Sequence, residues 1–158
     1  MTSALFSIQP IAAEDIVFWR RLRHSLWPQA SIDEHEREIA EILSMPDRYA
    51  AFMAFSETKM AVGFAEASIR HDYVNGCDTS PVLFLEGIYV APDARRQGIA
   101  KALFKSVEQW GTSHACDEFA SDTDVHNIDV QALHRALGFE ETERVVFFRK
   151  RTAKVEST

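Results

Sequence analysis

Apolar residues recur every three or four positions in four segments of the chain, which is the spacing of helices that bury one face. In the first segment, residues 16, 18, 19, 22 and 26 are apolar and Pro28 follows them, so the helix should end before the proline. Ser31 and Glu34 have the spacing of a capping box, which predicts a second helix from there to about Met45. The predicted helices span residues 14–26, 31–45, 98–113 and 128–137, and Gly138 closes the last.

Between these helices, short segments rich in branched and aromatic residues are bounded by turn residues, a pattern that predicts β-strands. The predicted strands are residues 5–8, 49–55, 62–70, 82–90, 118–121 and 144–149. One strand, two helices and three strands, followed by alternating helices and strands, indicate an α/β fold with a mixed central β-sheet flanked by helices. No repeat, linker or low-complexity segment interrupts the 158 residues. We therefore expect residues 1–158 to form a single domain.

Charge and composition narrow the classes of function. The net charge of −7 disfavours nucleic acid and favours a cationic partner. Eight carboxylates lie between Asp117 and Glu143 against one basic residue, Arg135. A solvated acidic face explains most of these carboxylates, and a site for a polyamine-like substrate is the alternative.

Targeting and metal-binding signals are absent from the sequence. No apolar run approaches the ~20 residues of a membrane span, and residues 1–13 lack the pattern of a signal peptide. The two cysteines should be reduced thiols, so we expect a cytoplasmic protein without membrane contact. None of the six histidines has the spacing of a metal site, and we expect no metal.

The turn that leads into the third predicted helix is the most informative stretch. Pro92 ends an apolar run, two arginines follow, and Gly98 opens the helix. The first backbone amides of a helix lack intrahelical acceptors and lie at the positive end of its dipole, so they can bind a pyrophosphate. Gly98 and Ala100 lack bulk and allow a phosphate to approach the main chain. An ordinary strand-to-helix turn with solvated arginines is the alternative.

Arg95-x-x-Gly98-x-Ala100 resembles the Arg/Gln-x-x-Gly-x-Gly/Ala signature of the GNAT family of acetyl-CoA-dependent N-acetyltransferases. Longer strings resemble the bacterial aminoglycoside 6′-N-acetyltransferases within that family, and RHDYVNGC and GFEETERV are the most specific. The matching strings lie in order at residues 26–28, 70–77, 84–88, 120–123, 131–139 and 140–145. The resemblance implies the GNAT fold, an acyltransferase activity and acetyl-CoA as acetyl donor.

The same resemblance implies where acetyl-CoA is held. The pyrophosphate would bind the backbone amides of the turn, and the pantetheine arm would pair with the preceding strand as a peptide would. Asn127 stands where the family places a side chain on the cofactor, and it can also cap the helix that begins near Ile128. The implied cofactor-binding residues are Ile88, Tyr89, Val90, Arg96, Gln97, Gly98, Ile99, Ala100, Lys101 and Asn127.

By resemblance, Glu86, Asp122 and Glu143 bind the aminoglycoside, while Tyr73 supplies hydrogen bonds and Trp27 a flat apolar wall. Apart from the resemblance, Glu86 is a charge in a strand of nearly all apolar residues, which costs free energy unless the group is functional or paired. Asp122 follows a strand, where side chains converge on clefts. Taken alone, Trp27 would be a core residue and Tyr73 a turn aromatic.

Acetyl transfer to an ammonium group requires that the amine lose a proton and that the thiolate leave. Asp122 or Glu86 is the candidate base. His134 stands four residues before the Gly-Phe pair, where many GNAT enzymes have a tyrosine that protonates the leaving thiolate. A packed helix residue is the equally weighted alternative for His134.

The implied function is that of an aminoglycoside 6′-N-acetyltransferase, which confers antibiotic resistance because acetylation removes a positive charge that the drug uses on ribosomal RNA. The alternatives are a GNAT enzyme for a polyamine or other small cationic amine, and a non-catalytic acetyl-CoA-binding module. Related enzymes are frequently homodimers, and the apolar residues 145–148 offer an edge that a second copy could cover. A strand buried within one subunit is the other interpretation of these residues.

Overall fold

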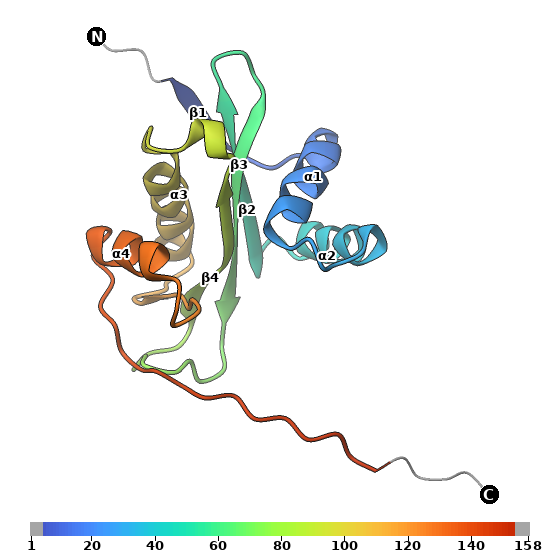
Figure 1. Cartoon of the computed structure of the whole chain (residues 1–158). Coiled ribbons are helices and arrows are strands. Elements are labelled where there is room, and N and C mark those ends of the chain that lie inside the picture. Colours follow the sequence, from blue (N-terminus) through green and yellow to red (C-terminus); the bar gives the residue numbers. More distant parts are fainter. Residues whose placement is uncertain (1–4, 154–158) are drawn as a thin grey trace, which may run out of the picture. The chain divides into compact units, whose positions relative to one another are not determined.

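The computed structural model describes residues 5–153, and Figure 1 shows the course of the chain. Its internal contacts group into two compact units, the first ending at Asp122 and the second beginning at Thr123. The first unit contains the sheet and helices α1 to α3, and the second contains helix α4.

A mixed sheet forms the centre of the first unit. Its strands lie in the order β1-β2-β3-β4-β5; β1 to β4 are antiparallel to their neighbours, and β5 runs parallel to β4. The predicted α/β class is confirmed, and these strands occur at the predicted positions with small differences at their ends. They are β1 Phe6–Pro10, β2 Tyr49–Ser56, β3 Ala61–Arg70, β4 Val82–Val90 and β5 Phe119–Ala120.

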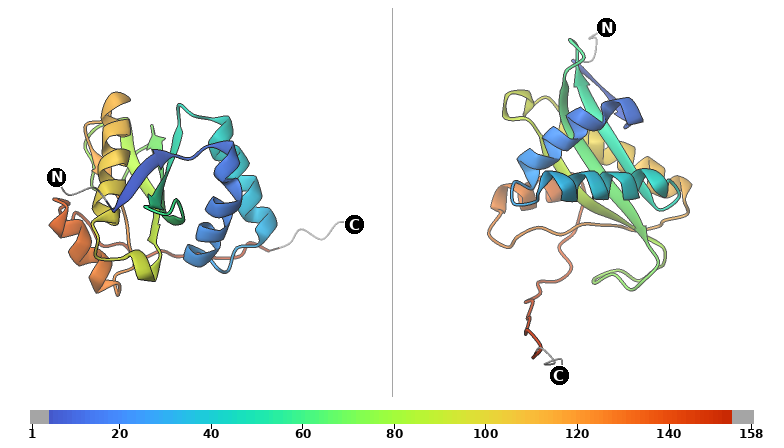
Figure 2. Two further views of the ribbon diagram at one scale, coloured as in Figure 1. Left: turned by 90° about the horizontal axis from the view of Figure 1, so that it is seen from above. Right: turned by 90° about the vertical axis from the view of Figure 1, so that its right-hand side faces the viewer.

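Helices cover both faces of this sheet. Helices α1 and α2 pack on one face and α3 on the other, as Figures 1 and 2 show. The Ser31 hydroxyl accepts a hydrogen bond from the Glu34 amide, and the Glu34 carboxylate accepts one from the Ser31 amide, so the predicted capping box is confirmed. The helices of this unit are α1 Ile16–Leu26, α2 Ile32–Ser44 and α3 Ile99–Ser113, with short 3-10 turns at η1 Ala13–Asp15 and η2 Pro92–Ala94.

Large apolar side chains fill the space between the sheet and the α1–α2 pair. Trp19 of α1, Ile39 of α2, Met53 of β2 and Phe64 of β3 are buried there as one cluster. Because each element contributes a bulky side chain, the two helices are held firmly against the sheet. This packing fixes the positions of the residues that α1 and α2 present beside strand β4.

On the opposite face, Gly111 sets how closely α3 approaches strand β4. A Cβ added to Gly111 would lie 2.5 Å from Leu83 Cδ2. Atoms cannot approach so closely without displacement, so a side chain here would push α3 away from the sheet.

The second unit contains helix α4, Ile128–Ala136. The Asn127 side-chain oxygen accepts a hydrogen bond from the Val130 amide at 3.2 Å, which confirms its predicted capping role. Gly138 follows the helix with a φ of 93°, the left-handed conformation that ends many helices.

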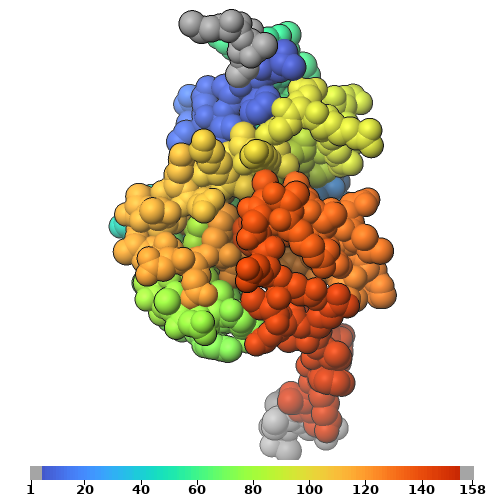
Figure 3. Space-filling view, turned by 90° about the vertical axis from the view of Figure 1, so that its left-hand side faces the viewer, coloured from blue at the N-terminus to red at the C-terminus, as the bar shows by residue number. Residues whose placement is uncertain are grey.

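The prediction of a strand at residues 144–149 is wrong. Residues 139–153 have no regular secondary structure, and the segment after α4 ends in a narrow extension (Figure 3). The side chains of Val145, Val146, Phe147 and Phe148 are exposed. Branched and aromatic residues favour a strand, but a strand needs a neighbour that supplies backbone hydrogen bonds, and no described strand pairs with this segment.

Replacing Gly111 with alanine should lower the free energy of unfolding by about 1–3 kcal/mol, because the added methyl group collides with Leu83. At an unobstructed helix position, the same change would raise stability by up to about 1 kcal/mol. Urea denaturation measures the difference. The exposed neighbour Thr112, changed to alanine, is the control and should stay within about 0.5 kcal/mol of the wild type. A Gly111→Ala protein more stable than the wild type would contradict the packing argument.

Candidate active site

Strand β4 contains a β-bulge at Glu86. Across the antiparallel pair with β3, Gly87 lies opposite Glu66 and Leu85 lies opposite Ala67, which leaves Glu86 as the extra residue. A bulge bends its strand locally and redirects the side chain of the extra residue. Glu86 therefore departs from the regular alternation of the strand.

The Glu86 carboxylate is paired with groups from β3. Its Oε1 accepts hydrogen bonds from Ser68 Oγ at 2.5 Å and from Arg70 Nη2 at 2.9 Å. The Arg70 guanidinium lies over the ring of Phe84, 3.6 Å from its centroid. The charge in this apolar strand thus has a partner, and the carboxylate is still about one-third exposed, with 34% of its side-chain surface accessible.

Trp27, directly after α1, packs its indole ring against Gly87. A Cβ on Gly87 would lie 2.5 Å from Trp27 Cζ2 and Cη2, so only a glycine allows the ring to sit there undisturbed. The ring also meets Phe64 at a steep angle, with 6.1 Å between the centroids. The Arg23 guanidinium lies over the indole, 4.8 Å from its centroid. These contacts place an aromatic wall beside the residue that follows Glu86.

A cavity of about 530 Å³ lies in the first unit among α1, α2 and strands β2 to β4. Trp27 and Glu86 both line it, so the structure brings together two of the predicted acceptor-binding residues. A cavity with several carboxylates and an aromatic wall is suited to a cation with a carbon skeleton. Its charged lining residues are Glu38, Glu41, Glu66, Glu86 and Arg23, and Gln29, Ala30, His35 and Tyr49 also contribute.

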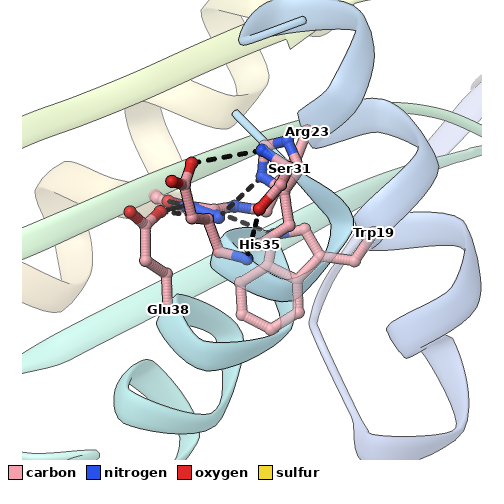
Figure 4. A network of polar contacts seen from close by, with 7 residues as sticks. Trp19, Arg23, Ser31, His35 and Glu38 are labelled. Atoms are coloured by element: carbon pink, nitrogen blue, oxygen red, sulfur yellow. Dashed lines mark hydrogen bonds and ion pairs between the residues drawn. The ribbon is translucent and has the colours of Figure 1, made fainter. Parts of the chain in front are cut away.

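A network of buried polar groups joins α1, α2 and β3 at the cavity (Figure 4). Arg23 Nε donates a hydrogen bond to Glu66 Oε1 at 2.7 Å, and Trp19 Nε1 donates to the same oxygen at 2.8 Å. The two Nη atoms of Arg23 donate to Glu38 Oε2 at 2.9 and 2.5 Å. One guanidinium therefore connects a buried carboxylate of β3 with a half-exposed carboxylate of α2 through charge-assisted hydrogen bonds.

Glu66 titrates near neutral pH. Its side chain is buried, and this burial raises the pKa to about 7, although the charge of Arg23 and the hydrogen bond from Trp19 oppose the shift. Desolvation disfavours the charged form of a carboxyl group, and here it outweighs the attraction of the arginine. The Arg23–Glu66 ion pair is thus complete above neutral pH and loses its negative partner below it.

The protonation of His35 follows from its contact with Arg23. Arg23 Nη1 lies 3.2 Å from His35 Nδ1. Because a guanidinium can only donate, Nδ1 accepts, and the imidazole is neutral with its proton on Nε2. Within residues 5–153, this Nε2 is the one buried side-chain nitrogen or oxygen without a hydrogen-bond partner. A buried donor without an acceptor costs about 1–3 kcal/mol.

The turn before α3 has the geometry of an anion site. Arg96 and Gly98 have φ values of 63° and 87°, and Gly98 is the N-cap of the 15-residue helix α3. The backbone amides of residues 96–101 donate no hydrogen bond to any described residue. A Cβ on Gly98 would meet nothing within 4 Å, so the space beside this residue is open. The free amides at the positive end of a long helix suit a pyrophosphate.

Strand β4 has a hydrogen-bonding edge next to this turn. Strand β5 pairs with β4 at Leu83 and Phe84, whereas from Leu85 to Val90 the one strand among the described residues that pairs with β4 is β3. In an antiparallel pair, alternate backbone groups point away from the neighbouring strand. This edge, which includes residues 88–90, can therefore receive a peptide-like ligand such as a pantetheine arm.

The other predicted site residues lie elsewhere. Tyr73, in the loop between β3 and β4, is 77% exposed, and Asp122 is exposed shortly after β5; neither lines the cavity. In the second unit, His134 Nδ1 donates to the Val130 carbonyl at 2.7 Å, and Glu143 is exposed in the irregular segment. The roles of these four residues stay predictions.

The sequence analysis missed Arg23, Glu66 and His35. Glu66 could have been found by the argument that singled out Glu86, because it is also a charge within an apolar strand. Arg23 lies four residues after Trp19 on the buried face of α1, where a charged residue interrupts the apolar stripe. The contact between these two residues has no signal in the sequence.

The sequence model of the acetyltransferase (GNAT) family matches residues 16–139. The chain belongs to the GNAT family. The match extends from the first residue of α1 to just beyond α4, so it includes the cavity, the turn before α3 and the open edge of β4.

Curated relatives of this GNAT chain are similar over most of its length. It is 56% identical over 133 residues to an aminoglycoside N(6′)-acetyltransferase type 1 of Salmonella typhimurium, covering 84% of this chain and 90% of the relative. It is 46% identical over 144 residues to the protein of the same name from Acinetobacter baumannii, covering 91% and 97%.

Solved structures show the same similarity. AAC(6′)-Iy in complex with the bisubstrate analogue CoA-S-monomethyl-acetylneamine is 51% identical and superposes with a TM-score of 0.89, covering 93% of this GNAT chain and 99% of that structure. Within residues 5–153, no helix combines the length and the apolar character needed to cross a membrane.

Proposed function

We propose that this GNAT enzyme transfers the acetyl group of acetyl-CoA to the 6′-amine of aminoglycosides in a ternary complex, and so confers resistance to them. The observation that carries the proposal is the cavity in which Trp27 and Glu86 occur together with the carboxylates Glu38, Glu41 and Glu66. The names of the similar proteins identify the acceptor, and the cavity provides the chemistry that such an acceptor needs.

An aminoglycoside presents several ammonium groups on rings with apolar faces. Carboxylates in a partly enclosed cavity attract the ammonium groups more strongly than they would in bulk water. The indole of Trp27 offers a flat surface for a ring and a π-face for a cation. The half-exposed Glu86 carries its charge at the cavity wall, where an ammonium group can replace part of its contact with Arg70.

Acetyl-CoA fits the turn before α3 and the open edge of β4. When bound, it supplies an acyl group activated as a thioester. The amides of residues 96–101 hold the pyrophosphate, and the backbone of residues 88–90 pairs with the pantetheine arm. The absence of intrachain acceptors for these amides and the open space at Gly98 support this assignment.

Proton transfer must accompany acetylation, because an ammonium group cannot act as a nucleophile. Glu86 or Asp122 takes the proton from the bound amine, directly or through water. His134 is the candidate donor to the leaving thiolate. From the family pattern, the proposal also assigns Asn127 to the cofactor, and Tyr73 and Glu143 to the aminoglycoside.

We further propose that residues 1–158 act as one domain and that the enzyme is a cytoplasmic homodimer. Exposed apolar residues support the assembly, because Val145, Val146, Phe147 and Phe148 are uncovered on a single chain. Contiguous exposed apolar side chains of this size are typical of interaction surfaces. A second copy that supplied a neighbouring strand would cover them and satisfy their backbone groups.

Gly98→Val should raise the KM for acetyl-CoA by about ten-fold or more and change the KM for the aminoglycoside less, because its side chain obstructs the approach to the turn amides. Valine at a φ of 87° also strains the backbone. Gly138→Val is the matched control, since Gly138 has a φ of 93° and equally open surroundings. Unchanged affinity of a folded Gly98→Val protein for CoA in calorimetry would overturn the pyrophosphate assignment.

Glu86→Gln and Asp122→Asn should each weaken aminoglycoside binding and turnover by roughly ten- to a hundred-fold, the loss of one charge-assisted contact. Acetyl-CoA binding should change little. The KM of the wild type for aminoglycoside should rise with salt, because exposed charges are screened. Steady-state kinetics over a pH series would show which variant loses the basic limb of the profile. Glu57→Gln, in the exposed β2–β3 turn, controls for net charge.

The assignment of the acidic residues fails if both variants retain wild-type activity on every aminoglycoside tried. Activity on polyamines in place of aminoglycosides would support the polyamine alternative. Binding of acetyl-CoA without turnover on any amine would support a non-catalytic module.

Light scattering at micromolar concentration should report about twice the chain mass of 17.9 kDa. Phe148→Asp should shift the mass toward that of one chain, because it places a charge on the surface that the second copy covers. Lys101→Asp, in α3, tests whether an added negative charge alone has this effect. A wild-type mass of one chain would exclude the homodimer.

A further inference from the structure

Arg23 makes more contacts with the cavity wall than its pairing with Glu66 requires. It is 2% exposed, and its guanidinium touches groups from three elements. Glu66 comes from β3, Glu38 and His35 from α2, and the indole of Trp27 from the end of α1. A planar guanidinium can donate from its edge and stack through its face at the same time, which an ammonium group cannot do.

These contacts form a chain that leads to Glu86. Glu66 lies opposite Gly87 in the β3–β4 pair, so the carboxylate that anchors Arg23 stands on the same rung of the sheet as the glycine beneath Trp27. Arg23 stacks on the indole, the indole packs on Gly87, and Glu86 is the bulged residue next to that glycine. The position of the aromatic wall relative to the Glu86 carboxylate thus depends on the Arg23–Glu66 pair.

We propose that Arg23 and Glu66 are positioning residues for the acceptor amine, because their buried ion pair holds the Trp27 indole against Gly87 beside Glu86. The inference rests on the proposed function, since it concerns the same cavity. Neither residue takes part in proton transfer: both Nε–H of Arg23 and Oε1 of Glu66 are engaged with each other, and Trp19 occupies the same oxygen.

A buried ion pair is a costly way to fill a core. Replacing such a pair with apolar residues of similar volume is often neutral or stabilising in other proteins. An apolar pair would lack the directional contacts to Glu38, His35 and Trp27 that fix the guanidinium in one orientation. The pair therefore contributes position more than stability.

Protonation of Glu66 should weaken this device. The charged or titratable groups that face it are Arg23 on α1, Glu38 and His35 on α2, and Glu86 on β4. The two carboxylates raise its pKa further, the arginine lowers it, and His35 is neutral. Since the pKa of Glu66 is about 7, the ion pair is present at about pH 8 and largely lost at about pH 6.

Glu66→Gln should raise the acceptor KM by about ten-fold at about pH 8 and leave the KM for acetyl-CoA within about two-fold. Glutamine resembles the protonated carboxyl group, so the ratio of variant to wild-type acceptor KM should fall toward one at about pH 6. Arg23→Lys keeps the charge next to Glu66 but lacks the planar stacking group, and it should raise the acceptor KM in the same direction. It also serves if Glu66→Gln does not fold.

The exposed pair Arg20–Glu36 provides the matched control. It joins the same two helices at 2.5 Å, and neither residue lines the cavity. Glu36→Gln should leave the acceptor KM and its pH dependence at the wild-type values. An equal rise in Glu36→Gln and Glu66→Gln would overturn the proposal, because it would show a general effect of loosening α1 from α2. A ratio that does not change with pH would overturn it as well.

A measurement without acceptor separates this inference from the proposed function. In a Trp110→Phe background, the remaining indoles are the fully buried Trp19 and the cavity-lining Trp27. Acrylamide should quench Trp fluorescence more strongly after Glu66→Gln or Arg23→Lys, because Trp27 is no longer held on Gly87. Unchanged quenching in both variants overturns the positioning role. A wild-type protein that acetylates no aminoglycoside, yet shows the increased quenching in both variants, overturns the proposed function alone.

Discussion

Strand β4 pairs with one neighbour along most of its length, and this constraint shapes both halves of the candidate active site. Strand β5 is two residues long and meets β4 only near its beginning. Beyond that point, β4 presents backbone groups to a ligand on one side while β3 holds it on the other. The strand then leads into the turn whose free amides begin α3, so one continuous segment can hold both ends of a long cofactor.

The bulge in the same strand provides the other half of the site. A regular strand would continue its alternation through Glu86, whereas the extra residue shifts the register between Leu85 and Gly87. Gly87 then leaves room for the indole of Trp27, and the carboxylate of Glu86 remains at the cavity wall. The acceptor and the acyl donor can therefore meet along one strand, which is the geometry that direct transfer between two bound substrates requires.

Two arginines balance the negative charge around the cavity in different ways. Arg70 neutralises Glu86 from a partly exposed position, so an ammonium group can compete with it at little cost. Arg23 is buried, and its removal would leave Glu66 without a partner in a desolvated position. The exposed pair suits binding that must be reversible, while the buried pair suits a fixed framework.

The residue pattern by itself determined the helices, most strands, the capping of α2 and α4, and the turn before α3, because each depends on residues within a few positions of one another. It also marked Glu86 as a charge that needs a partner or a role. Tertiary structure decided which partner this was, where the bulge falls, and that Arg23 meets Glu66 across 43 positions of sequence. It also decided against a strand at residues 144–149: side chains express a preference for extended structure, but the backbone hydrogen bonds that make a strand come from another segment.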